Sequence, residues 1–130
     1  MYEEYDPELY CKLFVDIDDI SREGLQALLV ECLGDQVKSA DRWSIAGLLF
    51  AIDVRRNDGF DIIRRNEPDG FLYYRYYLDI DAESSQPRAD QIAPVAQILE
   101  CLWEHGYAAV AACDFEDELP RRGGYNPDGR

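Results

Sequence analysis

Residues 71–81, FLYYRYYLDID, are the longest run of aromatic and β-favouring residues in the chain, with no glycine or proline inside it. Alternation along this run divides its side chains between two faces of a strand. The set expected to face a core is Leu72, Tyr74, Tyr76, Leu78 and Ile80. The set expected to line an open sheet surface is Phe71, Tyr73, Arg75, Tyr77 and Asp79. The run therefore predicts a central β-strand, around which the other elements can be arranged.

Three further segments have strand patterns. Residues 9–18 alternate clearly and predict a first strand, residues 43–56 predict a second, and the alanine-rich residues 107–115 predict a last one. Gly47 marks either a bulge or the true start of the second strand. The side chains of that strand expected to face inward are Leu48, Phe50, Ile52 and Val54. Residues 60–65 fit either a short extra strand or a loop, and this choice stays open.

Two segments carry apolar residues at helical spacing. Ser21 is expected to cap the first helix at its N-terminus, and Gly34 to end it. Asp90 is expected to cap the second helix, which Gly106 ends. This start keeps Pro94 near the first turn, where proline is least disruptive.

The element order is therefore β-α-β-β-α-β, which predicts an α/β (α+β) fold of the ferredoxin-like sandwich type. The expected sheet is four-stranded and mainly antiparallel, in the order 4-1-3-2, with both helices on one face and the other face open. We expect one domain over residues 1–120 and a flexible C-terminal tail over residues 121–130.

Acidic residues outnumber basic ones, 27 to 13, which gives a formal net charge of -14. Such a charge disfavours nucleic acid and anionic lipid as partners and favours a basic protein partner. The N-terminal MYEEYDPE lacks the basic and apolar regions of a signal peptide, and no apolar run is long enough to span a membrane. A cytoplasmic protein is expected.

The four cysteines form no CxxC pair and no Cys/His pair with zinc spacing. Each lies in an apolar pattern, so we expect small buried hydrophobes in a reducing compartment. Cys11 and Cys113 are predicted on neighbouring strands, so a disulfide between these two is left open.

The open face would bring together aromatic and cationic side chains from residues 9–18 and 71–81. Domains of the RNA-recognition-motif type share this fold and stack bases on such aromatics, but this chain has no RNP1-like run and its net charge has the wrong sign. A protein interface fits better. The residues expected to anchor a partner are Tyr10, Phe14, Tyr73, Arg75 and Tyr77. In the alternative reading these tyrosines pack on one another, or the chain termini cover them.

Acidic residues are expected at both ends of the sheet, where they would steer a cationic partner. Asp16 and Asp18 would lie at one end, and the others at the opposite end: Asp79, Asp81, Asp114, Glu116, Asp117 and Glu118. The alternatives are a solvated rim and a divalent-metal site, but the chain has no EF-hand loop or spaced ligand motif. No cofactor, metal or catalytic motif is expected, and the sole histidine, His105, suits the end of a helix.

The segments FLYYRYYLDID and AACDFEDELP (residues 111–120), together with small size and acidity, resemble the small acidic immunity proteins of bacterial polymorphic-toxin and contact-dependent-inhibition systems. The resemblance implies a non-enzymatic protein that neutralises a cognate toxin domain, often a cationic nuclease, by direct binding. It carries over no individual residues. Two alternatives stay open: a self-associating domain that binds small ligands, similar in architecture to ACT-type domains, and a metal-dependent enzyme that uses carboxylates. The oligomeric state is left open.

Overall fold

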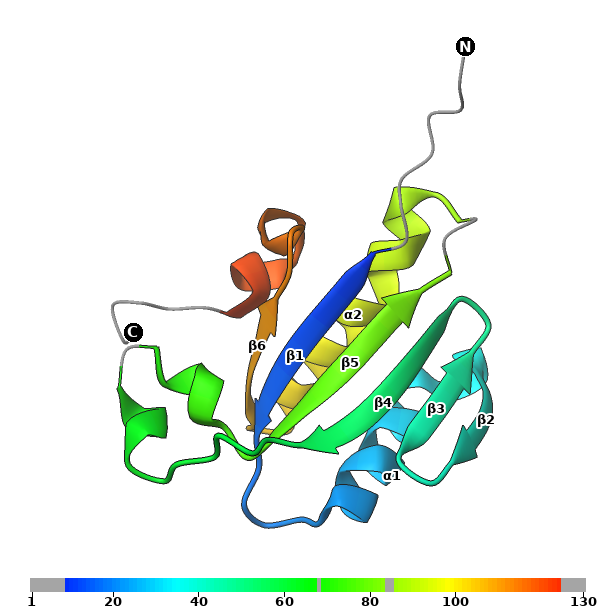
Figure 1. The fold of residues 1–130 in the computed structure, drawn as a ribbon. Helices are drawn as coiled ribbons and strands as arrows, with labels where there is room; N and C mark the ends of the chain where they lie inside the picture. Colours follow the sequence, from blue (N-terminus) through cyan, green and yellow to red (C-terminus); the bar gives the residue numbers. More distant parts are fainter. Residues whose placement is uncertain (1–8, 68, 84–85, 125–130) are drawn as a thin grey trace.

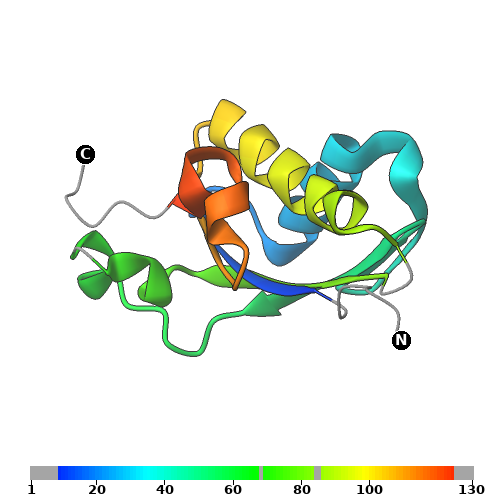
Figure 2. The ribbon, with the colours of Figure 1, turned by 90° about the horizontal axis from the view of Figure 1, so that it is seen from above.

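The computed structural model describes residues 9–67, 69–83 and 86–124. These residues form a six-stranded antiparallel sheet in the order β2-β3-β4-β5-β1-β6, with two helices on one face (Figure 1; Figure 2). The elements in chain order are β1 (Tyr10–Asp16), α1 (Arg22–Leu33), β2 (Val37–Asp41), β3 (Ser44–Gly47), β4 (Phe50–Arg56), β5 (Tyr76–Ala82), α2 (Arg88–Glu104) and β6 (Ala108–Ala112). The mixed α+β class is as predicted.

The expected number of four strands was wrong. The inner strands β6-β1-β5-β4 follow the expected 4-1-3-2 order, but β2 and β3 form a hairpin that extends the sheet beyond β4. The sheet therefore departs from the four-stranded ferredoxin-like one. Residues 60–65 do not form a further strand; this segment enters a short 3₁₀ helix at Arg64–Asn66.

The predicted strand over residues 43–56 is in fact the hairpin β3–β4. Gly47 permits the turn, because a Cβ at this position would lie 2.2 Å from the ring of Phe50. Leu48 was expected to face inward, but the turn leaves its side chain 61% exposed. The prediction therefore treated two strands and the turn between them as one continuous strand.

The central strand β5 starts at Tyr76 and not at Phe71. Tyr76, Leu78 and Ile80 are buried as predicted, whereas Leu72 is 46% exposed. Residues Gly70–Tyr73 form a 3₁₀ helix instead of a strand. The reason lies in a distant side chain: the amide of Asn57 donates hydrogen bonds to the carbonyl oxygens of Leu72 and Tyr74. These two carbonyl groups are therefore bonded to a side chain and not to a neighbouring strand of the sheet.

The helix ends match the sequence pattern except at the start of α2; Gly106, with a φ of 87°, follows the end of α2 as predicted. The Ser21 hydroxyl accepts a hydrogen bond from the Gly24 N–H at 3.1 Å, and Gly34 ends α1 with a φ of 57°. Helix α2 begins at Arg88, so the expected cap at Asp90 was wrong. Pro94 consequently lies well inside α2, where it is buried against the core.

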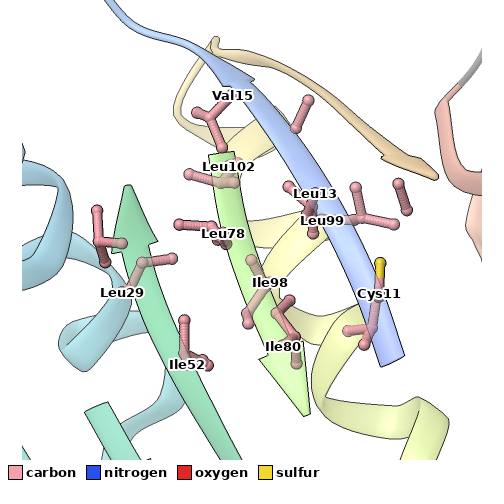
Figure 3. Close-up of a cluster of buried hydrophobic side chains, with 14 of the residues drawn as sticks. Cys11, Leu13, Val15, Leu29, Ile52, Leu78, Ile80, Ile98, Leu99 and Leu102 are labelled. Atoms are coloured by element: carbon pink, nitrogen blue, oxygen red, sulfur yellow. The ribbon is translucent and has the colours of Figure 1, made fainter. Parts of the chain in front are cut away.

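The core lies between the sheet and the two helices (Figure 3). Alternate residues of the strands point into it, and the inward faces of α1 and α2 close it. Its fully buried residues include Leu13, Val15, Leu29, Leu78, Ile98, Leu99 and Leu102. Because all of this burial is on the helix side, the opposite face of the sheet is left to the surface and to the loops.

Two of the four cysteines are joined in a disulfide that was not predicted. Cys32 in α1 and Cys101 in α2 form a disulfide, so the prediction of four unpaired buried thiols was wrong. The other two remain free thiols: Cys11 lies in β1 and Cys113 directly after β6. The interaction with Cys113, together with burial, raises the pKa of the Cys11 thiol. The expectation of a reducing compartment therefore loses the observation on which it rested.

The C-terminal part of the described chain packs on β6. Residues Pro120–Gly124 form a kinked 3₁₀ segment in which Gly123 is buried, and the Arg121 guanidinium lies 4.4 Å from the centre of the Trp103 ring. The rest of the predicted tail, residues 125–130, and the acidic N-terminal residues 1–8 lie outside the described residues. No helix in the described part of the chain is long and apolar enough to cross a membrane.

Candidate functional site

The sheet face turned away from the helices, here called the open face, carries a band of charged and aromatic side chains. Strand register places them side by side, because Lys12 pairs with Asp79, and Asp79 pairs with Asp53 on the next strand. Asp16 at the end of β1 pairs with Arg65. The other residues of the open face on β1, β4 and β5 that remain at least partly accessible are Tyr10, Lys12, Ala51, Asp53, Arg55, Tyr77, Asp79 and Asp81. Two cationic side chains thus stand among three carboxylates, so the face is nearly balanced in charge.

Polar contacts hold this face together. The Tyr10 hydroxyl donates to Asp79, and the Arg55 guanidinium donates to the other oxygen of the same carboxylate. Burial and the hydrogen bond to Asp79 raise the pKa of Tyr10 well above its ordinary value. The Lys12 ammonium lies 4.2 Å from the centre of the Tyr77 ring. The face is therefore a preformed surface of interlocked side chains.

Phe14, a predicted anchor on this face, is only 4% exposed. The ring of Phe71 packs edge-on against it, with 5.4 Å between ring centres. Phe71 comes from the segment between β4 and β5, which folds over this end of the open face. Phe14 is therefore a packing residue and leaves the set of candidate anchors.

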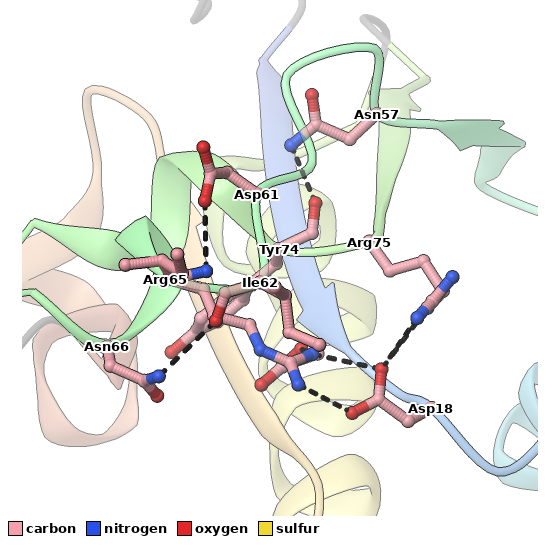
Figure 4. Close-up of polar contacts among 10 residues, drawn as sticks. Asp18, Asn57, Asp61, Ile62, Arg65, Asn66, Tyr74 and Arg75 are labelled. Carbon is pink, nitrogen blue, oxygen red and sulfur yellow. Dashed lines mark hydrogen bonds and ion pairs between the residues drawn. The ribbon is translucent and has the colours of Figure 1, made fainter.

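The segment between β4 and β5 (residues 57–67 and 69–75), here called the β4–β5 loop, projects beyond the end of the sheet (Figure 1; Figure 2). Internal hydrogen bonds order it (Figure 4). Asn57 bonds across the loop to Leu72 and Tyr74, and the Asp61 carboxylate accepts from the backbone N–H groups of Ile63 and Arg64. The loop is thus a structured lobe, although its sequence was ambiguous.

Ion pairs fasten this lobe to the end of β1 (Figure 4). The Arg65 guanidinium contacts the carboxylates of Asp16 and Asp18, each at 2.9 Å, and Arg75 contacts Asp18 at 3.0 Å. The Arg75 guanidinium also lies 4.2 Å from the centre of the Phe60 ring. Asp16, Asp18 and Arg75 were predicted to face a partner, but their first role here is to hold the loop.

The two carboxylates at Arg65 have pKa shifts of opposite direction. Hydrogen bonds from Arg65 lower the pKa of Asp18, and those from Arg75 act in the same direction. Burial raises the pKa of Asp16 and outweighs the attraction of Arg65. The charge of Asp18 therefore favours folding, whereas the charge of Asp16 opposes it.

Opposite responses to pH are expected. The contribution of Asp18 is present above its unfolded pKa and is lost as the pH falls through its lower folded pKa. The contribution of Asp16 is present below its unfolded pKa and is lost as the pH rises through its higher folded value. At pH 7, Asp18→Asn should therefore reduce the free energy of unfolding by roughly 0.5 kcal/mol, because the pair is half exposed and screened, while Asp16→Asn should leave it unchanged or raise it.

Denaturant unfolding at pH 7 and pH 3 measures both effects. The two variants should converge towards the parent at pH 3, where both carboxylates become largely protonated in the unfolded chain. A loss of stability for Asp16→Asn at pH 7 as large as that for Asp18→Asn would contradict this assignment.

The loop also exposes large apolar side chains that the sequence reading missed. Ile62 is 59% exposed and Ile63 is 74% exposed, and both lie in the turn that Asp61 caps. Tyr73, a predicted anchor, lies in the same loop, where its hydroxyl contacts the Arg64 guanidinium at 3.2 Å. An apolar pair on an ordered loop is a feature of binding surfaces. The sequence contains the Ile-Ile pair shortly after the Asn-Asp-Gly turn. From the sequence alone, however, such a pair is equally typical of a short buried strand.

The remaining acidic residues lie at the other end of the sheet. β5 and β6 both run antiparallel to β1, so the residues after β6 lie at the end opposite Asp16, as predicted. Glu116 accepts a hydrogen bond from the Cys113 N–H, and Glu118 pairs with Arg88 at 2.6 Å. Asp114 and Asp117 are exposed. Neither of these two side chains forms a hydrogen bond or an ion pair with another described residue.

The described residues hold no group of three or more His, Cys, Asp or Glu side chains placed to bind a metal ion. His105 lies at the C-terminal end of α2, where its Nδ1 is 2.8 Å from the Cys101 carbonyl oxygen. That contact orients the ring towards its own helix.

No family model, curated protein or solved structure matches this chain.

Proposed function

We propose that this protein is a non-enzymatic binding module that neutralises a cognate, cationic toxin domain, and that the β4–β5 loop and the adjoining open face form its interface. One observation carries the proposal: the loop exposes Ile62 and Ile63 while its own polar groups are bonded internally. Apolar side chains on a surface that is already ordered lose little further entropy when they are buried by a partner.

The open face supplies the polar part of such an interface. Tyr10 and Tyr77 combine an apolar ring with a hydroxyl, and Arg55 lies between two carboxylates. Tyrosine and arginine are enriched among the residues that dominate binding energy. Because the charges of this face nearly balance, attraction of a cationic partner must come from the rest of the -14 net charge. Exposed Asp114 and Asp117 belong to that remainder.

The test is a capture experiment with two matched variants. In Ile62→Asp/Ile63→Asp, a charge replaces each exposed isoleucine, and capture of a partner from host lysate should weaken at least tenfold, because each desolvated aspartate opposes binding. The control is Leu48→Asp, a leucine of similar exposure in the β3–β4 turn, at the end of β4 opposite to the β4–β5 loop. It should bind like the parent.

The captured partner must then be shown to be a toxin. The parent protein and Leu48→Asp should suppress its activity at equimolar amounts, and the isoleucine variant should not. Equal capture by the isoleucine variant, at the same protein concentration and salt, would remove the loop from the interface. A captured partner whose activity the parent leaves unchanged would remove the inhibitor role.

A further inference from the structure

A second surface feature lies away from the β4–β5 loop, between α1 and the β2–β3 hairpin. It is a groove of about 610 Å³ that is mainly apolar. Its floor and walls include Ala27 and Val30 of α1, Ala40 of β2, and the indole of Trp43 at the hairpin tip. Sites for small ligands have volumes of about 300–1,000 Å³ and similar linings. The groove therefore has the size of a ligand site.

The groove is fixed by contacts between its two walls. The Gln26 side chain of α1 donates to the Asp41 carbonyl oxygen at 2.6 Å, which ties the helix to the hairpin. The Arg22 guanidinium donates twice to the Val54 carbonyl oxygen and lies 4.2 Å from the centre of the Trp43 ring. Arg22 does not itself line the groove.

Trp43 occupies an unusual backbone conformation. Its φ is 63°, in the left-handed region that favours glycine and that strains a bulky residue. The Val54 N–H donates to the Trp43 carbonyl oxygen at 2.7 Å and holds this conformation. A glycine would satisfy the turn without strain, so the turn itself does not require an indole. Strain that the surroundings maintain in this way is a feature of functional positions.

The charged residues that line the groove are two acidic and one basic, which favours a cation. Glu23 and Asp41 both line it, and the face of an indole ring attracts positive charge. Arg42 also lines the groove, with its guanidinium 5.9 Å from the centre of the Trp43 ring. Arg42 thus approaches the position that an incoming cation would take, and it competes with one.

We propose that this groove binds a small organic cation, an ammonium group carried on an apolar body. The ammonium would lie between the Trp43 ring and the carboxylates of Glu23 and Asp41, and the body would lie on Ala27, Val30 and Ala40. This site is independent of the proposed toxin-binding surface, and it is tested on the isolated chain.

The experiment is calorimetric titration of the full chain with phenethylammonium, with 2-phenylethanol as the neutral probe of the same shape. The parent should bind the ammonium at least tenfold more tightly than the alcohol. Glu23→Gln should weaken ammonium binding several-fold and leave alcohol binding unchanged. Arg42→Ala should strengthen ammonium binding, because a competing cation is removed. Glu104→Gln, which removes an exposed carboxylate at the end of α2, is the matched control and should bind like the parent.

Trp43→Gly completes the set. It should retain the thermal unfolding transition, since glycine suits the backbone at this position, and should lose ammonium binding. Equal affinity of the parent for both probes, or equal weakening in Glu23→Gln and Glu104→Gln, would overturn the proposal. An absence of binding heat with phenethylammonium at concentrations up to about 10 mM, which would saturate a site with a Kd of about 1 mM, would overturn it as well.

Discussion

Gly70→Ala is expected to lower the free energy of unfolding by about 3 kcal/mol, at the upper end of the range for an added methyl group in a packed site. Gly70 is buried, and a Cβ on it would lie 2.1 Å from the carbonyl oxygen of Arg65 and 2.7 Å from that of Arg64. Both atoms belong to the backbone, so no rotation of a side chain can make room. The two short 3₁₀ helices of the β4–β5 loop would have to separate.

Separation of these helices would also release the contacts that fasten the loop. Arg65 holds Asp16 and Asp18 from the same turn that Gly70 packs against, and the Gly70 N–H donates to Glu67 at 2.7 Å. We therefore expect amide hydrogen exchange to accelerate in the loop more than in β1 or β5. Denaturant unfolding and amide exchange measured on the same variant distinguish this local effect from general destabilisation.

The matched control lies in the same loop. A Cβ on Gly59 would lie 3.3 Å from the side-chain oxygen of Asn57 and 3.8 Å from the Leu72 carbonyl oxygen, so a small shift of one side chain accommodates it. Gly59→Ala should change the free energy of unfolding by less than about 1 kcal/mol. If both variants lose equal stability, the close approach of backbone at Gly70 is not what organises the loop.

The same pair of variants separates loop order from loop chemistry in the proposed function. Gly70→Ala leaves Ile62 and Ile63 in place but removes the order that presents them. It should weaken partner binding even under conditions where the sheet remains folded, because the partner must then supply the ordering free energy. Gly59→Ala should bind like the parent.

The sequence predicts the two central strands best where one face is buried. β1 and the second half of the 71–81 run alternate cleanly because their inward residues pack on the helices and their outward residues do not. The first half of that run has equal β-propensity but is held out of the sheet by Asn57 and Gly70, which lie earlier in the chain. The β-propensity of a segment carries no information about contacts with residues elsewhere in the chain.

The missed elements have a different cause. β2 is almost entirely exposed on both faces, so its sequence, VKSAD, has no apolar alternation to detect. Its pairing depends on the hairpin that Trp43 closes in a conformation atypical of tryptophan. The groove beside it is invisible at the level of sequence, since its two walls come from a helix and a hairpin whose packing was not predicted.

Removal of the disulfide is expected to produce the other large change in stability. Cys32 and Cys101 are separated by 69 residues, and a cross-link over such a loop restricts the unfolded chain. The chain-entropy relation gives about 4 kcal/mol for this loop length, and measured values are commonly about 2–4 kcal/mol. The double variant Cys32→Ser/Cys101→Ser should therefore unfold at a temperature roughly 10 °C below the oxidised parent.

Other contacts between the two helices remain when the disulfide is removed. The Gln97 side chain donates to the Cys32 carbonyl oxygen at 2.9 Å and accepts from Gln36 at 2.7 Å, so the two helices keep polar contacts without the disulfide. The fold should consequently persist in the double variant. Its circular dichroism spectrum at 20 °C should match that of the parent.

Unfolding measured with and without a reducing agent tests whether Cys32 and Cys101, and not Cys11 and Cys113, form the disulfide. The parent should lose stability on reduction to the level of the double variant, whereas the double variant should not respond. Cys113→Ser changes the half-buried thiol beside Cys11 and keeps the disulfide, so it should respond to reduction as the parent does. If Cys113→Ser abolishes the response, then Cys11 and Cys113 form the cross-link in solution, and the two helices are held by packing alone.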